Sequence, residues 1–389
     1  MGKSDFLKDE LEKRKNNHLL RKLRITKPLP GGEIVVDGHK MLNFCSNDYL
    51  GLSGHPLLQE RAEEYLREYG AGSTASRLVC GNFDCFEKTE NRIAQLTGRE
   101  GVLIFNSGFQ TNVSLFPALT DSDSLILSDD YNHNSIIQGA LLSRCRVECF
   151  HHNDLNHLEQ LLKQNIDKGF SRILIATESI FSMDGDTSDI DSLIQLSVKY
   201  NSLLVVDEAH ATGVTGHNGM GLASGKDVDI LMGTLSKAAG SFGAYVAGSN
   251  DLREYLINFC YGFIYTTALP PSVVGSIDAA IELIPRMDRE RADLTEKAKR
   301  LRSSLNDMGY NTGNSTTQII PLIIGDERET LRLSEWLEEK GILAMTFRPP
   351  TVAKGESRIR LALSALHREE HIGRLLELLK EWREIGRMP

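Results

Sequence analysis

Residues 203–210 read Leu-Leu-Val-Val-Asp-Glu-Ala-His, a short apolar run that ends in two acids and an imidazole. A strand that is apolar along its whole length is buried on both faces, which is typical of a mostly parallel sheet covered by helices. Six further strand-like runs alternate mainly with helical stretches, and they cover residues 101–105, 125–128, 146–150, 172–177, 230–234 and 244–247. The chain is therefore expected to form an α/β fold with a mostly parallel seven-stranded sheet.

The segments outside this pattern predict two smaller regions. Apolar residues that recur among charges over 3–24 predict an N-terminal helix, and a long polar helix is expected over 273–308. The other expected elements are helices over 55–69, 87–96, 329–340 and 369–383 and strands over 33–36, 41–44, 319–324, 343–347 and 357–363. We therefore expect an N-terminal helix with short strands (1–45), a large α/β domain (46–280) and a smaller C-terminal α+β domain (281–389).

Composition excludes several classes of protein. The 389 residues carry 44 basic and 53 acidic side chains, and this net charge of −9 disfavours nucleic-acid binding. The six cysteines form no C-x-x-C pair, so they suit a reducing cytoplasm better than a zinc or redox motif. No apolar run is long enough to span a membrane, and the charged N-terminus lacks the apolar region of a signal peptide. A cytoplasmic protein without nucleic-acid or membrane partners is expected.

Polar residues follow three of the expected strands. Asp207 ends one strand, Lys237 follows residues 230–234, and Phe105-Asn-Ser-Gly-Phe109 leads from a strand into a helix. The carboxyl ends of parallel strands are where α/β folds bind ligands. The glycine turn presents backbone N–H groups at a helix N-terminus, where an anion such as phosphate binds.

These three features match the needs of pyridoxal 5′-phosphate (PLP). The cofactor requires a readily deprotonated lysine that forms a Schiff base, and Lys237 is the candidate. It also requires a carboxylate that keeps the pyridine nitrogen protonated, for which Asp207 is placed. The turn Ser107-Gly108-Phe109 is suited to the phosphate group. The three sites together predict a PLP enzyme.

Other interpretations of these residues are less specific. A lone lysine such as Lys237 is usually a surface residue. Asp207-Glu-Ala-His210 is also the DEAH box of helicases, but the phosphate loop that this class requires is missing, because Gly225-Lys226 is followed by Asp. His133 alone is more typical of a loop. His151, His152 and His157 form no recognisable ligand set and suit a solvated helix start, so no metal site is expected.

The chain as a whole resembles the α-oxoamine synthase family of fold-type-I PLP enzymes. Besides the lysine and DEAH segments, five blocks carry the resemblance and occur in order along nearly the whole chain. They are Asn43-Phe-Cys-Ser-Asn-Asp-Tyr-Leu-Gly-Leu52, Tyr69-Gly-Ala-Gly-Ser-Thr-Ala-Ser-Arg77, Glu178-Ser-Ile-Phe-Ser-Met-Asp-Gly-Asp186, Ile264-Tyr-Thr-Thr-Ala-Leu-Pro-Pro271 and Arg358-Ile-Arg-Leu-Ala-Leu-Ser-Ala-Leu-His367. Ala239 departs from the Leu or Phe that the family pattern has there, a change expected to affect packing more than chemistry.

The resemblance implies an acyltransferase that condenses an amino acid with an acyl thioester and releases CO₂. Phe347-Arg-Pro-Pro-Thr-Val352 is similar to members that join L-alanine to a pimeloyl thioester, on CoA or a carrier protein, in biotin biosynthesis. Members that use glycine, such as 2-amino-3-ketobutyrate CoA ligase and 5-aminolevulinate synthase, usually differ in this segment. A glycine-using member, or one with another acyl-CoA, stays an alternative.

The resemblance also implies roles for individual residues. Lys237, His133, Asp207 and His210 would be catalytic, with Lys237 as both anchor and base. The residues expected to hold PLP are Ser107, Gly108, Phe109, His133, Ser182, Asp207, His210, Thr234, Lys237, Thr266 and Thr267. The last two would reach the phosphate from the partner of a homodimer. The residues expected to contact substrate are Arg360 and Asn47 with His133, together with Arg21 and Thr351 on the acyl side.

Overall fold

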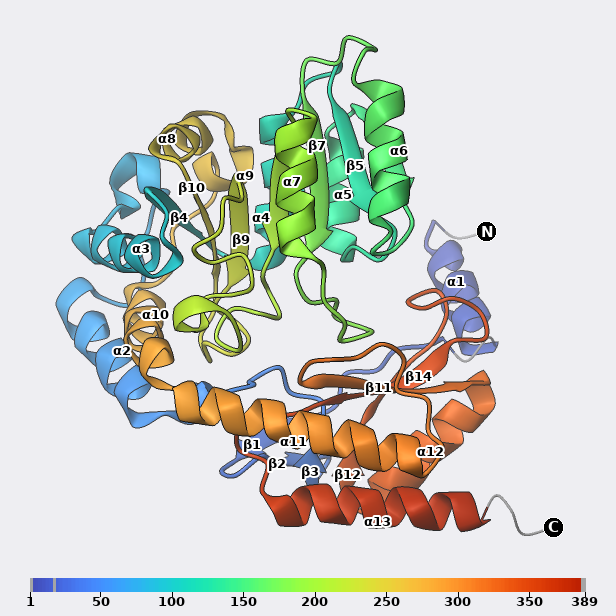
Figure 1. Ribbon diagram of the computed structural model, residues 1–389. Coiled ribbons are helices and arrows are strands. Elements are labelled where there is room, and N and C mark those ends of the chain that lie inside the picture. Colours follow the sequence, from blue (N-terminus) through green and yellow to red (C-terminus); the bar gives the residue numbers. More distant parts are fainter. Residues whose placement is uncertain (1–2, 17–18, 386–389) are drawn as a thin grey trace.

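A seven-stranded sheet forms the centre of the computed structural model, which describes residues 3–16 and 19–385 (Figure 1). Its strand order is β4-β10-β9-β8-β7-β5-β6, and only β10 runs antiparallel to its neighbours. The strands are β4 (Gly101–Phe105), β5 (Leu125–Asp129), β6 (Arg146–Phe150), β7 (Ile173–Glu178), β8 (Leu203–Asp207), β9 (Ile230–Thr234) and β10 (Ala244–Gly248). The expected mostly parallel sheet is confirmed.

The apolar strands are buried because helices cover both faces of the sheet. Side chains alternate along a strand, so Leu204 and Val206 of β8 belong to one apolar cluster and Val205 to another. The first cluster includes residues of α3 (Asp84–Thr97), α6 (Leu155–Asn165), α7 (Ile190–Lys199) and α10 (Pro271–Leu283). The second includes residues of α4 (Gly108–Leu119), α5 (Asn134–Leu142), α8 (Asn250–Phe259) and α9 (Tyr261–Ile264).

Two smaller sheets lie beyond one end of the central sheet. One has the order β11-β14-β13 and the other β1-β2-β3-β12, where β12 pairs in parallel with β3 and so joins the N-terminal strands to the C-terminal part. Their strands are β1 (Thr26–Leu29), β2 (Glu33–Val36), β3 (His39–Asn43), β11 (Ile319–Gly325), β12 (Ile342–Leu343), β13 (Met345–Phe347) and β14 (Ser357–Ala362). The helices of this part are α11 (Asp288–Asp307), α12 (Glu327–Glu339) and α13 (Glu369–Ile385).

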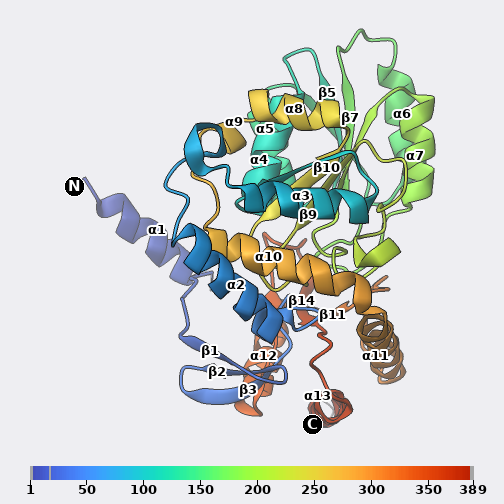
Figure 2. The ribbon, with the colours of Figure 1, turned by 90° about the vertical axis from the view of Figure 1, so that its left-hand side faces the viewer.

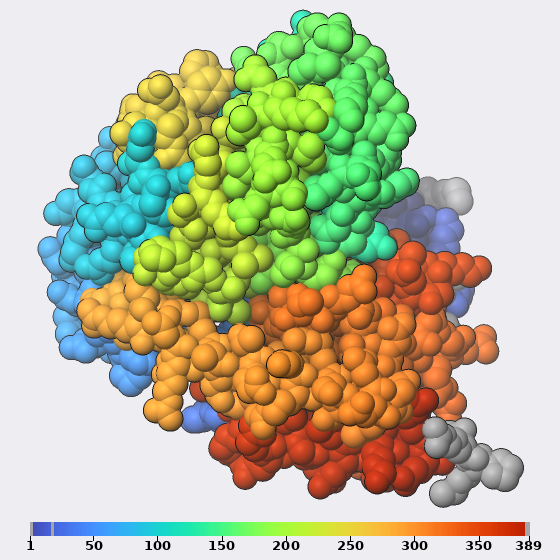
Figure 3. All heavy atoms as spheres, viewed as in Figure 1, coloured from blue at the N-terminus to red at the C-terminus, as the bar shows by residue number. Residues whose placement is uncertain are grey.

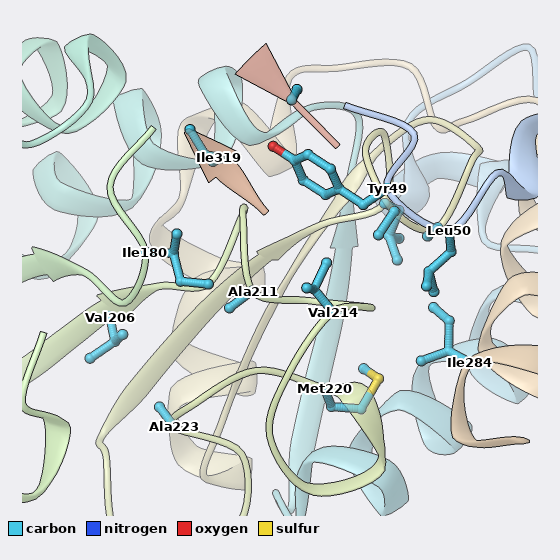
Figure 4. Close-up of a cluster of buried hydrophobic side chains, with 14 of the residues drawn as sticks. Tyr49, Leu50, Ile180, Val206, Ala211, Val214, Met220, Ala223, Ile284 and Ile319 are labelled. Carbon is cyan, nitrogen blue, oxygen red and sulfur yellow. The ribbon is translucent and has the colours of Figure 1, made fainter. Parts of the chain in front are cut away.

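The C-terminal part packs closely against the body that surrounds the central sheet (Figure 3). Figure 4 shows Ile180 and Ala211 of the body near Ile319, while Val206 and Ile284 lie at opposite sides of the view. All five side chains belong to one continuous apolar cluster. The two parts are therefore held together by a shared core, and the ends of β7 and β8 are enclosed between them.

Three expected elements are markedly shortened or divided in the structure. The helix expected over 3–24 is α1 (Asp5–Asn16); residues 17–18 lie outside the described residues, and 19–25 are not helical. The single helix expected over 273–308 is wrong. It divides at Pro285, whose ring nitrogen has no N–H to continue the α-helical hydrogen bonds, so α10 and α11 are separate. The strand expected over 343–347 also divides, because β12 and β13 pair in different sheets.

Helix α10 lies against α2 (Pro56–Tyr69) (Figure 2), and a buried carboxylate joins the two helices. Asp278 is fully buried, and its Oδ1 lies 2.8 Å from Arg92 Nη1 while its Oδ2 contacts Arg61 Nη1. Glu282, one turn further along, contacts Arg61 at 3.2 Å but is partly exposed. Asp278 therefore supplies the compensating charge that lets two arginines sit against α10.

We expect Asp278→Asn to lower the free energy of unfolding by about 3 kcal/mol, because it removes the fully buried charge of this network and leaves Arg61 and Arg92 with only the more exposed Glu64 and Glu282 as counter-charges. The matched variant Glu282→Gln, at a partly exposed position of the same network, should cost less than about 1 kcal/mol. Urea denaturation followed by circular dichroism measures both values. Equal losses for the two variants would contradict this assignment.

Candidate active site

Lys237 lies in the turn between β9 and β10, with its amine inside the protein. Its Nζ is 2.8 Å from His210 Nε2, and no carboxylate of the described residues lies within ion-pair distance of it. Burial lowers the pKa of the Lys237 amine to about 8, against the opposing influence of Asp207 and Glu178. A substantial fraction of this amine is therefore neutral near physiological pH, which is the form that acts as nucleophile or base.

His210 connects Lys237 to a buried tyrosine. The Nδ1 atom of its ring lies 2.7 Å from the Tyr49 hydroxyl, and both residues are buried. Burial, reinforced by the positive charges of Lys237 and Arg360, holds the pKa of His210 well below its usual range. The ring is therefore a neutral imidazole with one donor and one acceptor nitrogen. The sequence predicted His210 but not Tyr49.

Asp207 ends β8 as a buried carboxylate held by neutral donors. Asn112 Nδ2 donates to its Oδ2 at 2.8 Å, and the Ala209 N–H donates to its Oδ1 at 2.8 Å. Burial raises the pKa of Asp207. No Lys, Arg or His of the described residues forms an ion pair with it. A carboxylate that is fixed in place but lacks a cationic partner fits the protonated pyridine nitrogen of PLP.

Glu178 ends β7 beside Asp207 and was not among the predicted site residues. The two acids are direct neighbours in the sheet register, and Glu178 Oε1 accepts the His133 backbone N–H at 2.6 Å. Burial and the nearby Asp207 raise the pKa of Glu178 well above its usual range, which favours its neutral form. A signal was present in the sequence, because Glu178 ends its strand just as Asp207 does.

His133 caps α5 and keeps its ring available. Its Nδ1 pairs with Ser135 Oγ at 2.8 Å, and its backbone is fixed by the bond to Glu178. The residue is exposed rather than packed in the core. Burial of part of the ring lowers the pKa of His133, so the imidazole is neutral near physiological pH. A neutral ring on a backbone that is fixed in place is suited to stacking on a planar cofactor.

The N-terminus of α4 forms a cradle for an anion. Ser107 Oγ accepts the Gln110 N–H at 3.3 Å, and the first N–H groups of the helix have no partner within it. Thr234 Oγ1 lies 2.9 Å from Ser236 Oγ, and a Cβ placed on Gly108 would come within 3.7 Å of Thr234 Oγ1. A side chain at Gly108 would thus enter the space that a phosphate group needs. Ser236, which shares this cradle, was not predicted.

Thr266 and Thr267 lie beside the same cradle within the one chain. Asn106 Nδ2 donates to Thr266 Oγ1 at 3.1 Å and to the Thr267 carbonyl at 2.9 Å. Since Asn106 immediately precedes the α4 turn, this contact brings the two threonines close to the expected phosphate position. Their reach across a subunit interface stays a prediction.

Arg360, on β14, is a buried cation surrounded by neutral oxygens. Its two Nη atoms lie 3.2 Å from Asn47 Oδ1, Nη2 is 3.2 Å from the Tyr49 hydroxyl, and Nε donates to the Ser182 carbonyl. No carboxylate of the described residues pairs with it. Asn47, Ser182 and Arg360 are thus brought together as expected. A buried guanidinium without a counter-charge is suited to a carboxylate ligand.

The other predicted substrate residues lie apart from this group. Arg21 is exposed in the non-helical segment 19–25, and Thr351 is exposed in the loop between β13 and β14. Neither side chain has a hydrogen-bond partner among the described residues, and their contact with an acyl substrate stays a prediction.

His152 was expected at a solvated helix start, and this expectation is wrong. Its ring is partly buried between Asp129 and Asp186 and contacts both carboxylates.

Within residues 3–16 and 19–385, no cluster of three or more His, Cys, Asp or Glu side chains is arranged to hold a metal ion. None of the helices in these ranges has the length and apolar character needed to cross a membrane.

Comparisons with known proteins agree with this geometry. The family model of aminotransferase class I and II matches residues 39–379. A protein of Desulfosudis oleivorans named "Putative 8-amino-7-oxononanoate synthase" is 54% identical, over 98% of this chain and 100% of that protein. The 8-amino-7-oxononanoate synthase of Gluconacetobacter diazotrophicus is 46% identical, over 96% of this chain and 95% of that one. The fold is that of the serine palmitoyltransferase from S. paucimobilis, solved with bound PLP-myriocin aldimine (TM-score 0.91, 24% identity, 99% of each chain).

The lowered pKa of Lys237 predicts how PLP uptake depends on pH. Only the neutral amine adds to an aldehyde, so the rate of PLP capture by the apoprotein should rise about ten-fold per pH unit below pH 8 and level off above it. Stopped-flow absorbance between pH 6 and about 10 measures this rate. An exposed lysine in a short peptide is the control for the ionisation of PLP itself. A protein rate that keeps rising to about pH 10, as for the peptide, would contradict the lowered pKa.

Proposed function

We propose that this protein condenses L-alanine with a pimeloyl thioester. The basis is its family: the chain belongs to aminotransferase class I and II, and within it to the PLP-dependent α-oxoamine synthases. The products would be 8-amino-7-oxononanoate, CO₂ and the free thiol of CoA or a carrier protein, a reaction of biotin biosynthesis. The names of relatives that match over nearly their whole length support the choice of substrates. The fold-type-I architecture is shown by the likeness to PLP-bound structures.

The observation that carries the amino-acid half of this proposal is the buried, unpaired Arg360. Its guanidinium is linked through Tyr49 and His210 to the Lys237 amine. A substrate carboxylate bound by Arg360 and Asn47 would therefore lie in the same enclosure as the amine. Carboxylate and amine recognition at one place is what an α-amino acid requires.

The residues present fit PLP, which when bound supplies an electron sink for the charge left on the amino acid after loss of a proton or of CO₂. Asp207 would hold the pyridine nitrogen in its protonated form. The N-terminus of α4 with Thr234 and Ser236 would bind the phosphate group, and the available ring of His133 would cover the cofactor plane. Ser182 and His210 would contact the side of the phenolic oxygen.

Lys237 would carry the proton in the reaction. With a pKa of about 8, its amine removes the α-proton of the bound amino acid and holds that proton at Nζ, beside His210 Nε2. A positioned base of this kind contributes about 10²–10⁴-fold to the rate. Arg360 would fix the substrate carboxylate that is later lost as CO₂.

A matrix of substrates tests this function. We expect the fastest turnover with L-alanine and pimeloyl-CoA, compared with glycine and L-serine as amino acids and with acetyl-, succinyl- and palmitoyl-CoA as acyl donors. Thiol release measures the rate and mass spectrometry identifies the product. Lys237→Ala should reduce turnover at least about 10²-fold. Preference for glycine would instead indicate the alternative within the family.

We also propose that the chain acts as a homodimer whose interface borders the phosphate cradle. Exposed apolar side chains gather where α4, α9 and the π-helix at Arg77–Gly81 meet. Val79 is 77% exposed, Tyr261 71%, Tyr265 80% and Phe109 51%. Large apolar side chains grouped in this way are typical of a protein interface. A second copy seated here would cover them and place Thr266 and Thr267 at the interface.

Sedimentation of the purified protein should give twice the 43.3 kDa mass of one chain. Val79→Lys should shift the protein toward monomer by placing a charge in the interface. The control is Val198→Lys on α7, where the valine is 69% exposed and lies away from these segments. A monomeric parent protein, or equal dissociation of the two variants, would contradict the proposed interface.

A further inference from the structure

A histidine behind the candidate site is held between two aspartates. His152 follows β6; its Nδ1 lies 2.9 Å from Asp129 Oδ1 and its Nε2 lies 2.8 Å from Asp186 Oδ2. The two acids are 2% and 8% exposed, and the imidazole is 17% exposed. Both ring nitrogens face carboxylate oxygens, so the geometry suits an imidazolium that donates from each side.

The electrostatics agree with a charged ring. Burial works against protonation, but the hydrogen bonds and charges of Asp129 and Asp186 outweigh it and raise the pKa of His152 to about 10. Tyr131 stacks on the ring with centroids 4.2 Å apart, and Phe181 packs edge-on at 4.4 Å. The ring is therefore fixed in its plane as well as by its two hydrogen bonds.

Asn153, which follows His152, also forms hydrogen bonds with both aspartates. The Asn153 N–H donates to Asp129 Oδ2 at 3.0 Å, and its Nδ2 donates to Asp186 Oδ2 at 3.0 Å. Asp186 Oδ1 is buried without a hydrogen-bond partner among the described residues. His152 and Asn153 therefore supply the side-chain compensation for Asp186. Together they join the segments that follow β5, β6 and β7.

Two of these segments lead directly to site residues. Asp129 Oδ1 accepts the Tyr131 N–H at 2.8 Å, two residues before His133. The Asp186 carbonyl accepts the Phe181 N–H at 3.1 Å, and Phe181 precedes Ser182, whose carbonyl accepts from Arg360 Nε. The loop that carries His133 and the turn that orients Arg360 thus share one anchor.

We propose that His152 is a positioning residue that fixes, through Asp129 and Asp186, both the loop of His133 and the turn of Ser182. The inference rests on the roles proposed above for His133 and Arg360. Loss of the imidazolium would leave two buried acids without a counter-charge, which drives the segments apart. Stacking on PLP and orientation of the substrate carboxylate would then both weaken.

The protonation of His152 in the unaltered PLP-loaded protein is the first test. Protein labelled with ¹⁵N-histidine should show both ring nitrogens of His152 protonated at pH 8, when ordinary histidines are neutral. Two carboxylates, those of Asp129 and Asp186, act on the ring. Tyr131, which stacks on the ring, carries an ionisable hydroxyl as well. The signal is assigned by its loss in His152→Gln, or by its coupling to Asp129 and Asp186. A neutral ring at pH 8 would overturn the proposal.

Substitution provides the second test, with PLP affinity as a readout that does not depend on the substrate. His152→Gln should raise the PLP dissociation constant of the apoprotein about ten-fold and the amino-acid dissociation constant about as much. His151→Gln is the matched control, because the neighbouring imidazole is exposed and contacts only Asp130 among carboxylates. It should change neither constant.

A double variant separates positioning from simple loss of stability. Adding Asp186→Asn to His152→Gln removes the excess negative charge and should recover part of the lost PLP affinity. A lower melting temperature with unchanged PLP and amino-acid affinities would overturn the inference. If alanine proves not to be the substrate, the change in PLP affinity still reports on His152, so the two failures are distinguishable.

Discussion

Three carboxylic acids, Asp129, Glu178 and Asp207, end neighbouring parallel strands and are buried at one edge of the sheet, and the site depends on how their charge is compensated. Parallel strands make this crowding unavoidable, because their carboxyl ends meet at the same edge. Ionised acids this close together, and away from water, repel one another strongly. The negative charge of each acid is therefore compensated or disfavoured by a different set of neighbouring groups.

Asp129 pairs with the His152 ring, whose pKa its two aspartate neighbours raise to about 10. Burial next to Asp207 raises the pKa of Glu178 well above the usual range and so favours its neutral form, and its Oε1 accepts a backbone N–H. Asp207 receives only neutral donors from Asn112 and Ala209. Of the three, Asp207 is thus the one free to pair with a bound cation, in keeping with the role proposed for it toward the pyridine nitrogen of PLP.

Much of this arrangement could be predicted from the sequence, for a physical reason. Strands buried on both faces are apolar runs, so the central strands were located almost residue by residue, and Asp207, Lys237 and Gly108 stand out as polar or turn residues at their ends. Tyr49 could not be found in this way, because its partner His210 is 161 residues distant in the chain and pairing of this kind leaves no local pattern. The same holds for His152, whose isolated spacing indicates nothing until Asp129 and Asp186 surround it. The division of 343–347 likewise depends on pairing with β3.

A chain of hydrogen bonds runs from Lys237 through His210 and Tyr49 to Arg360, and it links the two ends of the site. His210 is neutral and carries one proton, and Tyr49 has a single O–H to share between His210 Nδ1 and Asn47 Oδ1, which lies 3.1 Å away. When Lys237 is an ammonium it donates to His210 Nε2. Nδ1–H then donates to Tyr49, and the Tyr49 hydroxyl turns to Asn47. When the amine is neutral and accepts from Nε2–H, Tyr49 must donate to Nδ1, and Asn47 loses that bond. Since Asn47 also holds Arg360, proton transfer at Lys237 changes the hydrogen bonding around the group that would bind the substrate carboxylate.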